Sequence, residues 1–327
     1  MKAMVLEAIG QPLRLRHLPD RRPGDGEIRL ALEACAVCRT DLHVVDGDLP
    51  QPHLPLIPGH EIVGIVDALG PGVDASLLGR RVGVLWLGGV CGHCEACTSS
   101  RENFCDHAIF TGYSRDGGFA TQVVATADFA FPLDGFEDPV STAPLLCAGL
   151  IGWRSLRMAG AGRAIGLFGF GAAAHILTQI CRWQGRDAFA FVRKGDDAAA
   201  AHAKALGCVW AGSSDEAPPH ELDAAIVFAP VGELVPKALA YVRKGGTVVC
   251  GGIHMSDIPA FPYRLLWGER IVRSVANLTR KDAIEFLAVA AAAKVRTRTT
   301  VYPLEHANDA LSNLRNGRFQ GAAVLVP

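Results

Sequence analysis

Residues 164–185 read AIGLFGFGAAAHILTQICRWQG, and no other segment of the chain limits the fold so narrowly. The apolar run 164–168 is typical of a buried strand, and the glycines that follow predict a tight turn. From residue 172 onward apolar side chains recur at helical spacing, which predicts an amphipathic helix. Strand, glycine turn and helix in this order begin a βαβ unit, from which parallel sheets are built.

The chain on either side of this segment divides into parts of different character. Before residue 149 the sequence is rich in short strands and Gly/Pro turns. After it, three more apolar runs predict strands, and the segments between them predict helices. The predicted strands are 187–194, 222–230 and 245–253, and the predicted helices are 196–207 and 235–245. This alternation predicts a doubly wound parallel sheet. Beyond residue 275 we expect a helix, followed by a further strand and helix.

Composition argues against several classes of function. Half of the 327 residues are hydrophobic, a fifth are charged, and the formal net charge is -1. A chain of this length exceeds one ordinary core, so we expect two domains. The near-zero charge gives no basis for binding nucleic acid or an anionic membrane. Because no apolar run could span a bilayer and MKAMVLEAIG lacks an export signal, we expect a cytoplasmic protein with reduced cysteines.

Four cysteines crowd the segment 91–105, which reads CGHCEACTSSRENFC. Two overlapping CxxC pairs and a fourth cysteine eight positions later can converge on one tetrahedral metal ion. Zinc suits four thiolates, and four protein ligands leave no open position for chemistry. We therefore predict a loop held by a structural zinc, whose ligands are Cys91, Cys94, Cys97 and Cys105. The alternative is a set of unrelated free thiols or a disulfide pair, which a reducing compartment disfavours.

A second set of metal-binding residue types is dispersed along the chain. Cys38 lies in CRTDLH, His60 and Glu61 lie in PGHE, and Cys147 lies in LLCAG. Two thiolates and one imidazole would leave a fourth zinc position open for water or an alcohol oxygen. Alone, such a cysteine is usually a core residue and such a histidine a hydrogen-bonded polar group. Their occurrence beside a four-cysteine loop favours a catalytic metal site.

In these motifs the chain resembles the zinc-dependent medium-chain alcohol dehydrogenases. CRTDLH, GHE, the four-cysteine segment, LLCAG and GFGAAA occur in that family's order and spacing, over essentially the full length. The resemblance implies an α/β protein with a mostly-β GroES-like catalytic domain and a Rossmann cofactor domain. The catalytic domain with its structural zinc lobe would cover 1–148, the cofactor domain 149–275, and 276–327 would return to the catalytic domain. A homodimer or homotetramer with two zinc ions per subunit is also implied.

The resemblance further implies an activity, the interconversion of primary or secondary alcohols and aldehydes or ketones by hydride transfer with NAD(P)(H). Cys38, His60 and Cys147 would bind the catalytic zinc, which lowers the pKa of an alcohol so that an alkoxide forms near neutral pH. Thr40 would accept the proton and His43 would pass it to water, as in the family's relay.

Further positions match the family around this centre. Asp41 would orient the histidine ligand, and Glu61 would either visit the metal during ligand exchange or remain a nearby carboxylate. Arg39 would contact the pyrophosphate of the cofactor. Trp86 and Leu87 fall where the family lines its alcohol pocket, although both residue types are equally typical of a core.

The glycine loop predicts a dinucleotide site, because a buried strand precedes it and a helix follows. Its first glycine permits the tight turn, its second lets the backbone approach a pyrophosphate, and its final alanine keeps helix and strand close. The phosphates would lie at the N-terminus of the helix. The loop residues assigned to the cofactor are Gly169, Phe170, Gly171, Ala172 and Ala174.

The kind of dinucleotide depends on the end of the next strand, where NAD-specific sites place Asp or Glu. Here that strand ends in Val192 and is followed by Arg193 and Lys194, so two cations favour the 2′-phosphate of NADP(H). In the alternative, the basic pair is a solvated turn and Asp196 or Asp197 binds the ribose.

Two residues depart from the family pattern. Ile151 stands where many relatives have a threonine near the nicotinamide, and Ala322 stands where relatives often place a phosphate-binding arginine. Both departures concern the affinity for the cofactor and leave the hydride chemistry unchanged.

Two other functions remain compatible with this fold. A polyol dehydrogenase of the same fold often lacks the third cysteine ligand, so Cys147 disfavours it. A non-catalytic redox sensor that binds zinc and a nucleotide would have no need of the relay pair Thr40 and His43.

Overall fold

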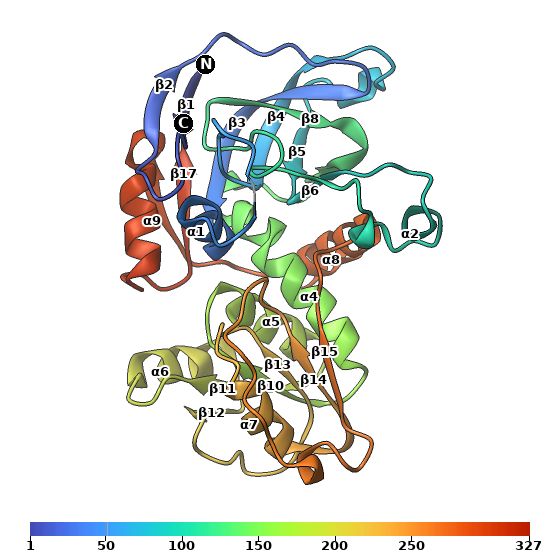
Figure 1. The fold of residues 1–327 in the computed structure, drawn as a ribbon, viewed down its shortest axis with the longest axis vertical. Helices are drawn as coiled ribbons and strands as arrows, with labels where there is room; N and C mark the ends of the chain where they lie inside the picture. The colour runs from blue at the N-terminus through green and yellow to red at the C-terminus, as the bar shows by residue number, and fades with distance from the viewer. Residues whose placement is uncertain (51) are drawn as a thin grey trace. The chain divides into compact units, whose positions relative to one another are not determined.

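The computed structural model describes residues 1–50 and 52–327, and the chain divides into two compact units (Figure 1). The first unit comprises Met1–Ala148, Thr279–Leu287 and Arg296–Pro327, and the second comprises Gly149–Leu278 and Ala288–Val295. Among the described residues, none of the helices combines the length and the apolar character needed to cross a membrane.

The first unit is built on a seven-stranded sheet with the order β16-β17-β3-β4-β5-β9, and β8 also pairs with β3. Strand β3 alternates between buried and half-buried residues along most of its length, because one of its faces packs on the core. Its neighbours β4, β8 and β17 are antiparallel to it, whereas β16 and β17 are parallel. The strands are β3 (Glu27–Val37), β4 (Glu61–Leu69), β5 (Arg81–Val84), β8 (Gln122–Thr126), β9 (Ala130–Pro132), β16 (Thr299–Pro303) and β17 (Ala322–Val326).

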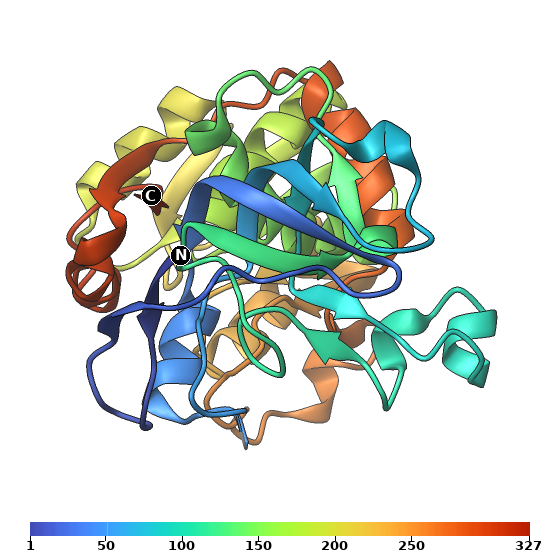
Figure 2. The same cartoon turned by 90° about the horizontal axis from the view of Figure 1, so that it is seen from above.

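Smaller elements surround this sheet. Two antiparallel pairs are formed by β1 (Lys2–Val5) with β2 (Arg14–His17) and by β6 (Leu87–Gly89) with β7 (Ile109–Phe110). The helices are α1 (Arg39–Asp46), α2 (Glu95–Thr98), α3 (Pro139–Thr142) and α9 (Ala307–Arg315). Helix α9 lies beside α1 and β17 (Figure 1). The segment that carries α2 projects away from the sheet of its own unit (Figure 2).

Short 3-10 turns join these elements: η1 (Ala75–Leu77), η2 (Glu102–Phe104), η3 (Ala127–Phe129), η4 (Ala143–Leu146) and η6 (Leu304–His306). The core of the unit lies between the sheet and its helices, and Leu30, Ile62 and Phe119 are fully buried there. Helix α8 (Arg280–Ala292) begins in the first unit and continues into the second.

The second unit is a six-stranded sheet in which every neighbouring pair is parallel. Its order is β12-β11-β10-β13-β14-β15, the order of a doubly wound dinucleotide-binding fold. The strands are β10 (Ala164–Phe168), β11 (Asp187–Val192), β12 (Trp210–Ser213), β13 (Leu222–Val227), β14 (Val242–Cys250) and β15 (Ile271–Ser274). The helices are α4 (Ala148–Ala159), α5 (Ala172–Trp183), α6 (Asp197–Leu206) and α7 (Leu234–Tyr241), and η5 spans Tyr263–Leu265. The predicted fold class is confirmed.

Two local predictions were wrong. Residues 242–244 were expected to continue a helix, yet they begin β14, because Val242 pairs with Leu222 of β13. The sheet therefore overrides the local helical preference of that segment. The four-cysteine segment was expected to be a loop, but it contains the short helix α2 and the turn η2. Cys94 is the N-cap of α2, and this single helical turn still leaves the four thiols close together.

Candidate functional site

The end of β3 and the start of β4 bring two predicted metal ligands together. The register pairs Ala36 with Glu61, so Cys38 and His60 lie at the same edge of the sheet. The turn before His60 requires the left-handed conformation of Gly59, whose φ is 98°, and a Cβ there would collide with a buried phenylalanine ring. As a result His60 Nε2 lies 3.2 Å from Cys38 Sγ.

Cys38 is also the N-cap of helix α1. Its sulfur accepts the backbone N–H of Thr40 at 3.3 Å, and its own N–H donates to Asp41 Oδ2 at 2.8 Å. The positive end of a helix favours the thiolate over the thiol. The cap therefore both orients this sulfur and prepares it to bind a cation.

Asp41 fixes the orientation of His60. Both side chains are fully buried, and His60 Nδ1 lies 3.1 Å from Asp41 Oδ1. Because a carboxylate accepts, the hydrogen bond is donated by the Nδ1–H group of His60. The lone pair of Nε2 then faces the sulfur of Cys38. This arrangement is the one a metal-binding histidine needs.

Cys147 and Glu61 complete the group. One donor atom from each of Cys38, His60, Glu61 and Cys147 lies within 4.8 Å of all the others. Cys147 enters from the end of η4, which packs on β4 and β5. Glu61 Oε1 is buried and has no hydrogen-bond partner among the described residues. A buried carboxylate oxygen without a partner is costly unless a cation satisfies it.

The charges of this group favour a cation at its centre. The hydrogen bond from Cys147 and the adjacent His60 hold the pKa of Cys38 well below its usual value, despite burial. Burial, and then the charge of Cys38, raise the pKa of Glu61 well above its usual value. Burial opposes a charge on His60, but the charges of Cys38 and Asp41 raise its pKa well above the usual range. Thiolate, imidazole and carboxylate donors fit zinc.

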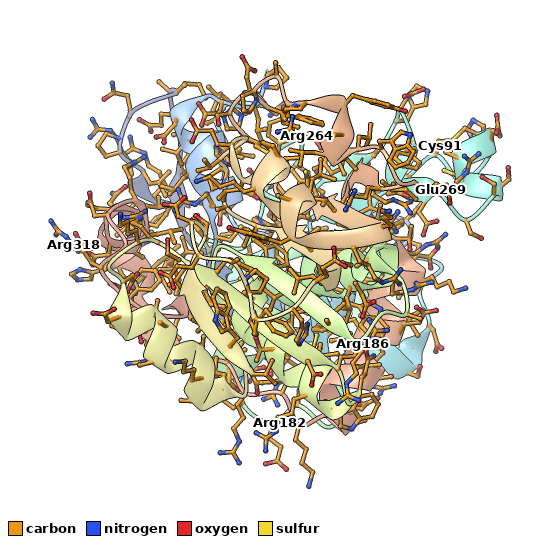
Figure 3. The ribbon with its side chains drawn as sticks, turned by 90° about the horizontal axis from the view of Figure 1, so that it is seen from below. Cys91, Arg182, Arg186, Arg264, Glu269 and Arg318 are labelled. Atoms are coloured by element: carbon orange, nitrogen blue, oxygen red, sulfur yellow. The ribbon has the colours of Figure 1, made fainter. Side chains whose placement is uncertain are left out.

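The four-cysteine segment forms a second, separate group. All four sulfurs lie within 4.8 Å of one another, at 3.5 Å for Cys94 and Cys97 and 3.9 Å for Cys91 and Cys97. Tetrahedral zinc with bonds of about 2.3 Å would space its sulfurs by about 3.8 Å, so the group fits that ion. Backbone N–H groups of His93 and Cys94 lower the pKa of Cys91 to about 6. Cys91 lies on the projecting segment (Figure 3), and the ten cysteines are free of disulfides.

The predicted relay residues both lie on α1. Thr40 is half-buried and His43 is buried in the last turn, while Arg39 is exposed at the first position of the helix. His43 Nδ1 lies 2.8 Å from Asp48 Oδ2. Sequence reasoning missed Asp48, and the available signal was an acid directly after the glycine that ends this helix.

Trp86 and Leu87 are both buried. The edge of the Trp86 ring meets the His60 ring, with centroids 5.1 Å apart, and its faces stack with Phe110 and Tyr113 at 5.3 and 5.7 Å. Trp86 therefore packs directly on a predicted metal ligand. Leu87 pairs with Phe110 between β6 and β7 and is 1% exposed, as expected for a core residue.

The glycine loop of the second unit has the shape that a pyrophosphate requires. Gly169 has a φ of 91°, and a Cβ there would lie 2.7 Å from the backbone nitrogen of Ala229. At Gly171 a Cβ would meet no atom within 4 Å, so the backbone faces open space in front of α5. Ala172 is the first residue of α5, and Ala174 is fully buried where α5 meets the sheet.

The residue between the two glycines is held by a histidine that sequence reasoning also missed. His175 Nε2 lies 3.1 Å from the carbonyl oxygen of Phe170, and the two rings are 4.9 Å apart. Its ring also contacts that of His202 on α6. A histidine directly after the loop motif was the available signal.

The residues predicted to select the dinucleotide are exposed. Arg193 and Lys194 directly follow β11. The carboxylate of Asp196 accepts the N–H of Ala199 at 3.0 Å and so caps α6. The two residues that differ from the family pattern lie in different elements. Ile151 is half-buried on α4, and Ala322 is 7% exposed in β17.

Comparison with known proteins adds independent evidence. Residues 24–135 match the family model described as the alcohol dehydrogenase GroES-like domain. AdhA, a probable alcohol dehydrogenase of Mycobacterium tuberculosis, is 43% identical over 314 residues, which cover 93% of this chain and 90% of that protein. An alcohol dehydrogenase of Geobacillus stearothermophilus is 37% identical over 337 residues, 99% of each chain.

The fold agrees with these sequence matches. A cobalt- and zinc-bound thermostable alcohol dehydrogenase from Pyrobaculum aerophilum superposes with a TM-score of 0.90 at 24% identity. The match covers 100% of this chain and 99% of that one.

Proposed function

This chain belongs to the zinc-dependent medium-chain alcohol dehydrogenases, and we propose how its own residues carry out that chemistry. It is an oxidoreductase that interconverts alcohols and aldehydes or ketones with a nicotinamide cofactor. The observation that carries the proposal is the convergence of Cys38, His60, Glu61 and Cys147 within 4.8 Å. Three widely separated segments supply these donors, which is difficult to explain without a shared metal ion.

We propose two zinc sites per subunit. Cys38, His60 and Cys147 would hold the catalytic ion, and Asp41 would keep His60 in the required tautomer. When bound, this zinc is a Lewis acid that lowers the pKa of an alcohol. Glu61 would remain beside it as a carboxylate available during ligand exchange.

The structural ion would lie in the four-cysteine segment, which has no spare ligand position. Its proposed ligands are Cys91, Cys94, Cys97 and Cys105.

The proton released by the alcohol needs an exit from a dry site. In our proposal Thr40 accepts it through its hydroxyl and His43 carries it onward to water. Both residues lie on α1, three positions apart, which supports a shared path along this helix. Trp86 packs on the His60 ring and would form part of the wall of the alcohol pocket.

The dinucleotide would lie against the glycine loop, with its pyrophosphate at the start of α5 and Arg39 as a further phosphate contact. The residues proposed to hold it in the second unit are Gly169, Phe170, Gly171, Ala172 and Ala174. Arg193 and Lys194 support NADP(H), because they are exposed after β11 and Asp196 is engaged as a helix cap.

We also propose domain roles and an assembly. Residues 1–148 and 276–327 would form the catalytic domain, 149–275 the cofactor domain, and the protein would form a homodimer or homotetramer. Sedimentation equilibrium would decide between these two assemblies and a monomer.

The test of the proposed function is aldehyde reduction by the purified protein, assayed with NADPH and NADH in parallel and with zinc measured by elemental analysis. In C38A one zinc per chain should be lost together with nearly all turnover, by about 100-fold or more. The matched control is C250A, because Cys250 lies in β14 outside both sulfur groups. Turnover retained by C38A would contradict the metal role. A folded, zinc-loaded wild type that oxidises neither cofactor would contradict the activity.

A further inference from the structure

The first unit contains a cavity that is distinct from both groups of metal-binding side chains. Its volume is about 570 Å³, within the range of about 300–1,000 Å³ that is usual for small-molecule sites. Strand β8 and the segments 53–57 and 114–117 supply most of its lining, and the N-terminal part of the chain supplies the rest. Within the described part of the chain, none of the lining residues belongs to the two sets of donors that converge on a metal.

The charged side chains of the lining are three arginines and two carboxylates. Asp116 accepts a backbone N–H with Oδ1 at 2.8 Å and the guanidinium of Arg21 with Oδ2. Glu27 accepts a backbone N–H with Oε2 at 3.0 Å and Arg115 Nη2 with Oε1 at 3.0 Å. Each carboxylate is therefore bonded through both oxygens and balanced by one arginine. The third arginine gives the lining a positive balance.

Arg22 is this third arginine. It lines the cavity, and across residues 1–50 and 52–327 its guanidinium forms no ion pair or hydrogen bond. A guanidinium presents its N–H donors as a planar fork that matches the oxygens of a carboxylate or phosphate group. Because the charge of Arg22 is not balanced by a carboxylate of the protein, this fork is available to an anion.

Arg115 adds donors whose position is already fixed. Its side chain is 21% exposed. Besides the bond to Glu27, Nη2 donates to the carbonyl of Val124 at 2.9 Å, and Nη1 donates to Thr126 Oγ1 at 3.2 Å. A guanidinium carries five N–H groups, so two of them form no bond to the described residues. Since the side chain is held in place before a ligand arrives, binding would cost little conformational entropy.

The remaining lining is also preformed, and part of it is apolar. Ile57 exchanges backbone hydrogen bonds with the opposite segment, since the N–H of Gly117 donates to its carbonyl at 2.7 Å. Ile57 and Val123 of β8 are 2% and 3% exposed. The cavity thus combines cationic donors with apolar side chains, which suits an anion with a carbon skeleton better than a bare inorganic ion.

We propose that this cavity is a binding site for a small organic anion. Arg22 and Arg115 take its carboxylate or phosphate group, and its carbon skeleton lies against Ile57 and Val123. The inference goes beyond the proposed function and does not depend on it, because no proposed metal ligand or dinucleotide contact lines the cavity.

The experiment is a calorimetric titration of the zinc-loaded full chain with succinate and, separately, with glycerol 3-phosphate. At least one of these probes should bind at one site per chain with a Kd of about 1 mM or below. R22Q should weaken this binding at least 10-fold, and R22K should weaken it less, because lysine keeps the charge but loses the fork. The matched control R318Q alters an exposed arginine outside the cavity and should bind as the wild type does.

Two further measurements locate the bound anion. Saturating NADPH should leave the Kd of the probe unchanged, and a crystal structure with the probe should place its oxyanion within hydrogen-bond distance of Arg22 and Arg115. The probe that binds identifies the recognised group as a carboxylate or a phosphate. Binding of neither probe, or equal affinities in R22Q and R318Q, would overturn the inference. Displacement of the probe by NADPH would also overturn it, because the anion would then occupy the dinucleotide site.

Discussion

His175 donates its Nε2–H to the carbonyl of Phe170 at 3.1 Å, so helix α5 holds the loop from which it emerges. Phe170 separates the two glycines of that loop, and its carbonyl direction sets where the next N–H groups point. We predict that H175L weakens dinucleotide binding about 3- to 10-fold, as expected for the loss of one buried hydrogen bond of about 1 kcal/mol. Fluorescence titration with NADPH measures the effect. H220Q, which alters an exposed histidine of the same unit, should bind normally, and an unchanged Kd in H175L would refute the role.

The cofactor preference should depend on the basic pair after β11. Replacing Arg193 and Lys194 together by alanine removes the cations proposed to face the 2′-phosphate. We expect KM for NADPH to rise at least 10-fold, by analogy with the loss of a charge-assisted hydrogen bond, while KM for NADH changes little. R182A is the control, because Arg182 is an exposed arginine at the end of α5 (Figure 3). Equal changes with both cofactors would show that the pair is a solvated turn.

The four-cysteine segment should contribute stability but no chemistry. We expect C97A to lose one zinc per chain and to unfold at a lower temperature, because the segment would lose its crosslink. The remaining zinc should still support turnover at temperatures where the protein is folded. Elemental analysis and calorimetry measure the two effects. Loss of both zinc ions from C97A would show that the two groups are not independent.

Asp223 joins two parallel strands, and its contribution to the free energy of unfolding should depend on pH. It accepts the N–H groups of Ala164 and Arg163 at 2.9 and 2.7 Å and pairs with Arg243. The bond from Ala164, followed by Arg243, lowers the pKa of this carboxyl in the folded state. The folded pKa lies below the unfolded one, so the stabilisation is fully present above the unfolded pKa, near 4, and is lost as pH falls through the folded pKa.

We therefore expect D223N to lower the free energy of unfolding by about 1–3 kcal/mol at pH 7. The difference from the wild type should shrink steadily below about pH 4. Urea unfolding followed by tryptophan fluorescence at several pH values gives both numbers. D215N, which breaks an exposed ion pair with Lys237, should leave the free energy of unfolding close to the wild-type value. A D223N deficit that does not change with pH would contradict this account.

Groups whose members lie a few residues apart could be predicted from the sequence. The four thiols lie close to one another because they belong to one short segment. The same holds for the two glycines at 169 and 171, which belong to one turn. The fold class was predictable for a similar reason, since strand and helix periodicities are local. The metal and cofactor roles of these residues stay predictions.

What the sequence did not reveal depends on backbone direction. The contact between Asp48 and His43 exists because one left-handed glycine reverses the chain, and no periodicity encodes that reversal. Likewise, Val242 joins β14 rather than α7 because a partner strand 20 residues earlier in the chain lies next to it. The local propensity of a segment contains no information about such a partner strand.

The position of β17 has a consequence for how the protein is made. It pairs Ala323 with Val37, the residue directly before Cys38, although the whole of the second unit lies between them in the chain. During synthesis the parallel sheet from β10 to β15 can form as soon as its strands have left the ribosome. The edge that carries Cys38 must wait for a strand translated much later. The proposed metal site around Cys38 would therefore be completed late in synthesis, after the second unit has been translated.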